Sequence, residues 1–196
     1  LVSAGVYNIP VVLIFNKMDL YFSEEIKYLD AFQFLYENIG YLCIRTSVKT
    51  LDGIETLKQQ LGNKVTLFSG NSGVGKSSMI NAIDETLSLR TGIVSESHDK
   101  GIHTTTFSEM FVIAGGYIID TPGVKGFGVV NVDPAEVGHY FPEIFEKSKD
   151  CKYYNCTHIN EPGCAVVSAV EKHQISQSRY TSYLSIFENK DSSKYR

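Results

Sequence analysis

Residues 70–77 read Gly-Asn-Ser-Gly-Val-Gly-Lys-Ser, and this octapeptide decides the fold. It has the full Walker A spacing, and it lies between an apolar, strand-like run at residues 65–68 and a helix-like segment at residues 77–83. The backbone N–H groups of such a loop surround phosphate groups at a helix N-terminus, where the helix dipole favours negative charge. We therefore expect a P-loop NTPase in which Lys76 approaches the β- and γ-phosphates and the Ser77 hydroxyl ligates Mg²⁺.

A second motif, Asn16-Lys17-Met18-Asp19, precedes this phosphate-binding loop in the chain. It closes a continuous apolar run at residues 11–15, as expected for a buried strand whose carboxyl end holds a ligand. The Asp19 carboxylate can accept hydrogen bonds from guanine N1–H and from the 2-amino group, and adenine has neither donor. In an ordinary GTPase the base-reading tetrad follows the phosphate-binding loop. The reversed order predicts a circularly permuted GTPase.

Two further segments fit the same pocket. Residues 46–49, Thr-Ser-Val-Lys, resemble the last GTPase element, whose backbone N–H meets guanine O6; Val48 replaces the usual Ala and should change little. Residues 120–123, Asp-Thr-Pro-Gly, would place Asp120 in the Mg²⁺ shell and the Gly123 N–H at the γ-phosphate. In isolation this tetrad is also ordinary turn chemistry, and its position after the phosphate-binding loop strengthens the functional interpretation.

The catalytic group is less clear from the sequence. Residues 100–106, Lys-Gly-Ile-His-Thr-Thr-Thr, indicate a switch loop in which one Thr hydroxyl completes the Mg²⁺ shell, and we favour Thr105 over its two neighbours. Val124 stands where Ras-like enzymes carry the Gln that orients the attacking water. Either His103, the nearest candidate in sequence, positions this water or a partner supplies the group, so we expect slow intrinsic hydrolysis that a partner stimulates.

Three sets of nucleotide-site residues are thus predicted. The catalytic set is Lys76, His103 and Thr105. The magnesium ligands are Ser77 and Thr105. The nucleotide-binding set is Asn16, Lys17, Asp19, Ser47, Val48, Gly70, Asn71, Ser72, Gly73, Val74, Gly75, Lys76, Ser77, Ser78, Asp120 and Gly123.

A cluster of metal-binding residue types follows in the last third of the chain. Cys151, Cys156, His158 and Cys164 offer three thiolates and one imidazole, which is a complete tetrahedral set for a structural Zn²⁺. The spacing differs from the common pair-and-pair zinc finger, and buried or redox-active cysteines are the alternative. The density of ligands in one short stretch favours zinc.

Composition sets the broad class. The 196 residues are 43% hydrophobic and 20% charged, with a net charge of −4, as in ordinary soluble proteins. No apolar run approaches the ~20 residues needed to span a bilayer, and the acidic balance does not by itself indicate nucleic-acid binding. We expect a cytoplasmic monomer with no membrane partner. The start at Leu1, without Met or a signal segment, suggests a trimmed chain.

Over the first 120 residues, apolar runs alternate with helix-like stretches, which predicts an α/β fold with a mostly parallel sheet. This alternation stops at Asp133. We therefore expect a circularly permuted GTPase domain at residues 1–132 and a small helical zinc-binding domain at residues 133–196. The expected strands are residues 11–15, 41–45, 65–68, 109–112 and 117–119, and the expected helices are residues 23–39, 54–61, 77–83, 166–173 and 176–189.

With these motifs the chain resembles the RsgA/YjeQ family of ribosome small-subunit-dependent GTPases. The resemblance rests on the permuted order, on the octapeptide at 70–77, on His-Thr-Thr-Thr at 103–106, on Asp-Thr-Pro-Gly-Val at 120–124, and on the cluster continuing Glu-Pro-Gly-Cys-Ala-Val at 161–166. Other permuted GTPases share the motif order, but the Cys/Cys/His/Cys domain that follows is the mark of this family.

The resemblance implies a factor that binds GTP or GDP, Mg²⁺ and one structural Zn²⁺. It implies action late in maturation of the small ribosomal subunit, contact with its rRNA, and hydrolysis stimulated by the subunit. It also places an OB-fold domain and a first GTPase strand before Leu1, so we expect this chain to be a fragment. Ile102 stands where the family usually has Arg. The alternatives are a GTP-sensing module with negligible turnover and a permuted GTPase that acts on the large subunit.

Overall fold

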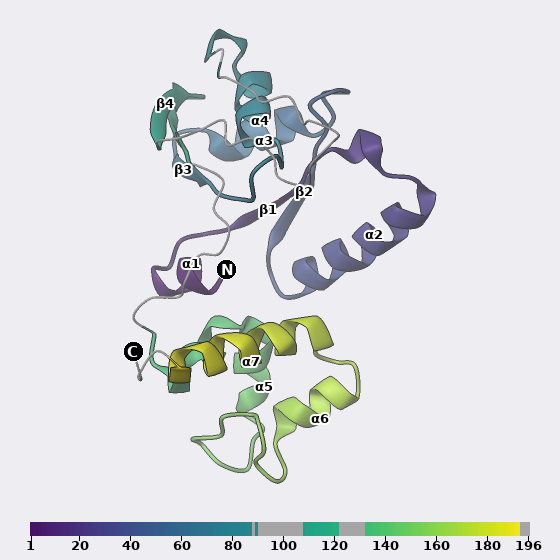
Figure 1. Ribbon diagram of the computed structural model, residues 1–196, viewed down its shortest axis with the longest axis vertical. Coiled ribbons are helices and arrows are strands. Elements are labelled where there is room, and N and C mark those ends of the chain that lie inside the picture. The colour runs from purple at the N-terminus through teal and green to yellow at the C-terminus, as the bar shows by residue number, and fades with distance from the viewer. Residues whose placement is uncertain (88, 90–107, 122–131, 193–196) are drawn as a thin grey trace. The chain divides into compact units, whose positions relative to one another are not determined.

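The computed structural model describes residues 1–87, 89, 108–121 and 132–192 (Figure 1). The chain divides into two compact units, which are considered separately below. The α/β unit comprises residues 12–34 and 42–127, and the helical unit comprises residues 1–11, 35–41 and 128–196. The helical unit thus includes two segments from the first part of the chain, and the domain boundary at Val132 stays a prediction.

Among the described residues, five short strands form the framework of the α/β unit. They are β1 (Val12–Phe15), β2 (Leu42–Arg45), β3 (Val65–Phe68), β4 (Glu109–Ile113) and β5 (Gly116–Asp120). Strands β1 and β2 pair in parallel, and the other three form a second sheet in the order β3-β5-β4. Strands β3 and β5 are parallel, whereas β4 runs antiparallel to β5 because a tight turn joins them. The expected parallel pairings are present, in two sheets.

The strand register brings the predicted site segments to the carboxyl edges of these sheets. Phe15 lies opposite Arg45, so the tetrad at residues 16–19 and the segment at residues 46–49 leave β1 and β2 at the same level. Phe68 lies opposite Asp120, so the phosphate-binding loop begins beside Asp120. Ligand groups gather at such edges in open α/β sheets.

The described residues of this unit include α3 (Ile54–Leu61), α4 (Lys76–Ile83) and most of α2 (Ser23–Asn38), whose last four residues belong to the helical unit. Ile54, Leu57 and Leu61 recur at helical spacing, and all three are buried. Helices α3 and α4 pack against each other, and their apolar residues share one core with both sheets. That core contains Ile44, Ile54, Leu57, Leu61, Phe68, Met79, Ile80, Ile83, Ile113 and Ile118.

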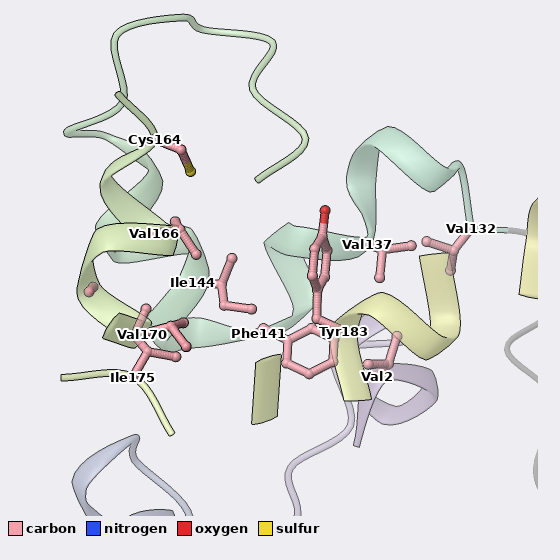
Figure 2. Packing of buried hydrophobic residues seen from close by; sticks show 11 residues of the cluster. Val2, Val132, Val137, Phe141, Ile144, Cys164, Val166, Val170, Ile175 and Tyr183 are labelled. Carbon is pink, nitrogen blue, oxygen red and sulfur yellow. The ribbon is translucent and has the colours of Figure 1, made fainter. Parts of the chain in front are cut away.

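The helical unit is built from short helices around Tyr183. They are α1 (Val2–Val6), the 3-10 helix η3 (Pro134–Tyr140), α5 (Pro142–Ser148), α6 (Ala165–Glu171) and α7 (Gln177–Ser192). Figure 2 shows Tyr183 of α7 among Val137, Phe141 and Ile144, and all four residues are buried. The described ranges contain no helix that is both long and apolar enough to cross a membrane.

Candidate nucleotide and metal sites

The predicted base-reading residues line one pocket of the α/β unit. Its volume is about 310 Å³, and it opens beside the start of α4. The lining residues are Asn16, Lys17, Asp19, Leu20, Val48, Lys49, Gly75 and Ser78. Segments that lie about sixty residues apart in the sequence therefore meet around a cavity, as the permuted GTPase interpretation requires.

Two side chains of the tetrad are bonded directly to the phosphate-binding loop. The Asn16 Nδ2 donates to the carbonyl oxygen of Val74 at 2.8 Å, and the Lys17 Nζ donates to that of Gly73 at 2.7 Å. The hydroxyl of Thr46, a fully buried residue, donates to Asn16 Oδ1 at 3.0 Å. The Asn16 amide is thereby held at both its nitrogen and its oxygen, which fixes the spacing between base pocket and loop.

Asp19 is held from the neighbouring segment. Its Oδ1 accepts a hydrogen bond from the Ser47 hydroxyl at 2.6 Å. Lys17, two residues earlier, has a left-handed backbone with φ of +66°, and this turn starts the 3-10 helix η1 (Met18–Leu20). The turn and the Ser47 bond together orient the carboxylate that would read guanine.

Glycine is needed at Gly75 for two reasons. Its φ of +97° is a left-handed conformation that L-residues avoid. A Cβ atom at this position would also lie 2.5 Å from Asn16 Nδ2. The close approach of the tetrad to the phosphate-binding loop thus depends on the missing side chain.

The Lys76 ammonium is folded into its own loop. Its Nζ donates to the carbonyl oxygens of Gly70 at 2.8 Å and Asn71 at 3.1 Å. Burial lowers the pKa of Lys76, and the charge of Asp120 opposes this shift. A cation that is nearly buried among carbonyl groups is well placed to exchange them for phosphate oxygens.

Hard oxygen donors come together where β3 and β5 end. The Ser77 hydroxyl donates to Asp120 Oδ2 at 3.0 Å, and both residues are buried. The Thr121 hydroxyl donates to the carbonyl oxygen of Phe68 at 2.8 Å, which ties the segment after β5 to the end of β3. A hydroxyl beside a carboxylate suits Mg²⁺, so these residues fit the predicted ion.

Ser72 lies in the described phosphate-binding loop, whereas the predicted residues His103, Thr105 and Gly123 lie outside the described residues, as does Val124. Their roles stay predictions.

The four predicted metal ligands of the helical unit converge. Their ligand atoms all lie within 4.8 Å of one another. The Nδ1 of His158 lies 3.6 Å from Cys151 Sγ and 3.5 Å from Cys164 Sγ, and these two sulfurs are 3.9 Å apart. Tetrahedral zinc with ordinary bond lengths requires about 3.6 Å between nitrogen and sulfur and about 3.8 Å between sulfurs. Cys151, His158 and Cys164 thus have the separations of a tetrahedral zinc site, and with Cys156 they form a donor set that is compatible with Zn²⁺.

Burial raises the pKa of the Cys156 thiol to about 12 and raises that of Cys164 as well. Because zinc binds thiolates, occupation of this site must displace protons. Cys164 has a second contact, since its sulfur accepts a hydrogen bond from the Val167 N–H at 3.4 Å at the start of α6. The site is thus joined to a helix as well as to its own loop.

The comparisons with known proteins match the predicted family and fold. A family model described as RsgA GTPase matches residues 1–130. The chain belongs to the RsgA GTPase family. Two solved structures share its fold: YjeQ from Thermotoga maritima, with a TM-score of 0.79 and 36% identity, and YloQ, described as a circularly permuted GTPase, with 0.78 and 33%. They match 96% and 100% of this chain, and the match covers 62% of each of those chains. The permuted fold predicted from the motif order is confirmed.

Curated members of the RsgA GTPase family are similar over the whole chain. The small ribosomal subunit biogenesis GTPase RsgA 2 of Bacteroides thetaiotaomicron is 58% identical over 197 residues. The small ribosomal subunit biogenesis GTPase RsgA of Porphyromonas gingivalis strain W83 is 49% identical over 200 residues. Both alignments cover 100% of this chain and 64% of the relative, so the chain spans about 64% of the length of these RsgA proteins.

Sequence reasoning missed three residues of the site in this RsgA family member. Leu20 and Lys49 line the pocket, and Thr46 holds Asn16. Lys49 and Thr46 belong to residues 46–49, a segment that was predicted to contact guanine. Their position beside the predicted residues Ser47 and Val48 was therefore a signal in the sequence. Leu20 directly follows the tetrad, where an apolar residue is easily assigned to a core.

Proposed function

We propose that this protein binds and hydrolyses GTP as a factor in late maturation of the small ribosomal subunit, and that the subunit stimulates hydrolysis. One observation carries the nucleotide part of this proposal. The guanine-reading tetrad and the phosphate-binding loop are joined by the hydrogen bonds of Asn16 and Lys17 at one pocket. Base and phosphates of a single nucleotide could therefore be bound together.

Each group has a role that follows from its chemistry. Asp19 accepts from the guanine N1–H and 2-amino groups, and the Val48 N–H donates to O6. The backbone N–H groups of residues 70–78 bind the phosphates, to which Lys76 adds a positive charge. Ser77 and Asp120 would hold Mg²⁺, which would neutralise the negative charge of the phosphates.

For the hydrolytic step we keep the sequence-based assignments. Thr105 completes the Mg²⁺ shell, Gly123 donates its N–H to the γ-phosphate, and His103 or a group of the partner orients water. Val124 has no hydrogen-bonding side chain, so the intrinsic step should be slow. Stimulation by a partner follows from this chemistry.

The partner comes from the relatives, whose names specify small ribosomal subunit biogenesis. We extend this to the subunit and its rRNA as partners of this protein, which we propose acts as a monomer in the cytoplasm. Zinc at Cys151, Cys156, His158 and Cys164 would serve a structural role, because four protein ligands leave no open position. The finer division into a GTPase domain and a zinc-binding domain at Val132 belongs to the same proposal.

The deciding experiment measures GTP hydrolysis by the purified protein alone, with small subunits and with large subunits. We expect slow turnover alone and an increase of at least about tenfold with small subunits only, since partner-supplied groups can add 10³-fold or more. A rate that small subunits leave unchanged supports the alternative of a GTP-sensing module. Stimulation by large subunits instead contradicts the assigned partner. Lys76→Ala is the control for hydrolysis by contaminants.

A further inference from the structure

The loop that carries His158 has an unfavourable backbone conformation at this residue. His158 has a φ of +58°, a left-handed conformation that is uncommon for residues with a side chain. It is also buried, with 6% of its surface exposed. A metal ligand in such a conformation needs restraints from its surroundings to keep its ring aimed at the site.

Helix α7 supplies restraints on one side of this loop. The Tyr180 hydroxyl donates to the carbonyl oxygen of His158, and the Tyr183 hydroxyl donates to that of Thr157, both at 2.6 Å. The two tyrosines are three positions apart and therefore lie on one face of the helix. They hold two consecutive peptide groups, including the carbonyl of the ligand itself.

Glu161 supplies restraints from the amide side. Its Oε1 accepts hydrogen bonds from the Thr157 N–H at 2.7 Å and from the Thr157 hydroxyl at 2.6 Å. Its Oε2 accepts from the N–H groups of Ile159 at 3.0 Å and Asn160 at 3.2 Å. The peptide group after His158 is thus held through both its carbonyl and its N–H, and the peptide group before it is held through its carbonyl.

Helix α7 is itself fixed against rotation next to these tyrosines. Arg179, adjacent to Tyr180, pairs with both carboxylate oxygens of Glu143 on α5, at 2.7 and 3.2 Å. Its guanidinium lies 4.6 Å from the centre of the Phe141 ring, and Arg179 is only 5% exposed. A buried bidentate pair has one preferred geometry, so the two hydroxyl groups are presented in a fixed direction.

We propose that Tyr180 and Tyr183 are positioning residues of the metal site, whose hydroxyl groups hold the His158 loop in its metal-binding conformation. This inference rests on the zinc site of the proposed function. The tyrosine rings also pack in the core of the helical unit, with Tyr183 and Phe141 edge to face at 5.8 Å between ring centres. The hydroxyl contribution must therefore be tested separately from the packing.

Substitution by Phe separates the contribution of the hydroxyl group from that of ring packing, because it keeps the ring and removes the hydroxyl group. We would compare Tyr180→Phe, Tyr183→Phe and the double variant with Tyr154→Phe. Tyr154 lies between two metal ligands in the sequence but is fully exposed, so it is a matched control. A second control, Val170→Ala, truncates a buried core residue of the same unit that lies on α6, outside the segment 151–164 that carries the metal ligands.

Two measurements report on the site directly: the rate of Zn²⁺ release to a chelator and the ligand-field absorption of the Co²⁺-substituted protein. Loss of partners around ligands commonly weakens metal binding about 10- to 100-fold, and we expect release from the double variant to accelerate within that range, with an altered Co²⁺ spectrum. Tyr154→Phe should match the wild type. Val170→Ala should lower the melting temperature and leave the Co²⁺ spectrum unchanged.

The outcomes separate this inference from the proposed function. Release within twofold of wild type, with an unchanged Co²⁺ spectrum in the double variant, overturns the inference and leaves the zinc site in place. A spectral change in Val170→Ala equal to that of the double variant also overturns it, because general destabilisation would then suffice. A wild-type protein that takes up neither metal overturns the zinc site together with the inference.

Discussion

In the α/β unit, the tetrad and the phosphate-binding loop restrain each other through Asn16 and Lys17, and Gly75 lets them approach. In the helical unit, the His158 loop is held by side chains of a helix some twenty residues further along the chain. The first arrangement uses residues that belong to the recognition motifs. The second uses Tyr180 and Tyr183, which lie outside any motif, beside Glu161 of the segment at 161–166. The sequence therefore predicts candidate site residues in both units, but the support from α7 is seen only in the structure.

The largest expected effect concerns the dependence of each unit on a bound metal. Removal of Zn²⁺ by a strong chelator should unfold the helical unit, because structural zinc contributes on the order of 10 kcal/mol in small domains. The α/β unit has its own core, so GTP affinity should change less than about threefold. Amide hydrogen exchange in α7 and titration with a fluorescent guanine nucleotide would measure the two responses. If removal of zinc also abolished nucleotide binding, the idea that the two sites are supported independently would be contradicted.

The next prediction concerns the base specificity of the nucleotide pocket. The substitution leaves in place the hydrogen bonds of Asn16 and Lys17 to the phosphate-binding loop. Asp19→Asn removes the charged acceptor for the guanine N1–H and 2-amino groups, and the resulting loss of about 3–4 kcal/mol should weaken GTP binding about 10²- to 10³-fold. Xanthine has a carbonyl in place of the 2-amino group, so the new amide can donate to it and affinity for XTP should rise. Competition binding with GTP and XTP tests this.

Ser47→Ala is the matched control for Asp19→Asn, since it keeps the Asp19 carboxylate and removes the hydroxyl that donates to Asp19 and accepts from the Thr50 N–H. Its expected cost is about 1 kcal/mol, or about fivefold in GTP affinity, with no gain for XTP. A variant Asp19→Asn that prefers GTP as strongly as the wild type does would remove Asp19 from the base-reading role.

Gly75→Ala tests the close approach itself. The added Cβ would meet Asn16 at 2.5 Å and would impose a left-handed conformation on alanine. Together these effects should cost about 2–3 kcal/mol and weaken GTP binding by up to about 100-fold. Gly40 has the same φ of +97° with nothing within 4 Å of the added atom, so Gly40→Ala controls for backbone strain alone. Equal losses of GTP affinity in the two variants would show that the contact with Asn16 is irrelevant.

The elements that the sequence could predict are those that local patterns encode. Strand β3 and helix α3 have the predicted bounds, because apolar periodicity and flanking glycines mark them locally. Helices η3 and α5 were not among the expected helices, and each begins with a proline, Pro134 and Pro142. Proline is favoured in the first turn of a helix, and the Asp133 carboxylate accepts from the Ala135 N–H to cap η3.

Other features depend on contacts that no local pattern encodes. The zinc ligands were predicted from residue type and density, but the hydrogen bonds of Tyr180 and Tyr183 join positions 22 and 26 residues apart. A mostly parallel sheet was expected with no strand order, and the described strands pair in the orders β1-β2 and β3-β5-β4. Strand pairing is a tertiary property, so alternation alone predicts the strands but not their neighbours.

The smallest expected effect concerns Ala114, which has a left-handed backbone conformation in the α/β unit although it is not glycine. The turn between β4 and β5 places Ala114 at φ +50° and Gly115 at φ +75°, both left-handed, as a two-residue hairpin turn requires. Glycine would relieve the strain at Ala114, although it also increases the freedom of the unfolded chain. Ala114→Gly should therefore raise the free energy of unfolding by about 0.5 kcal/mol. Gly115→Ala should lower it, since its Cβ would also lie 2.8 Å from Asn63 Oδ1. Denaturant titrations of the two variants should move in opposite directions while GTP affinity and zinc release stay unchanged, because this turn belongs to neither site.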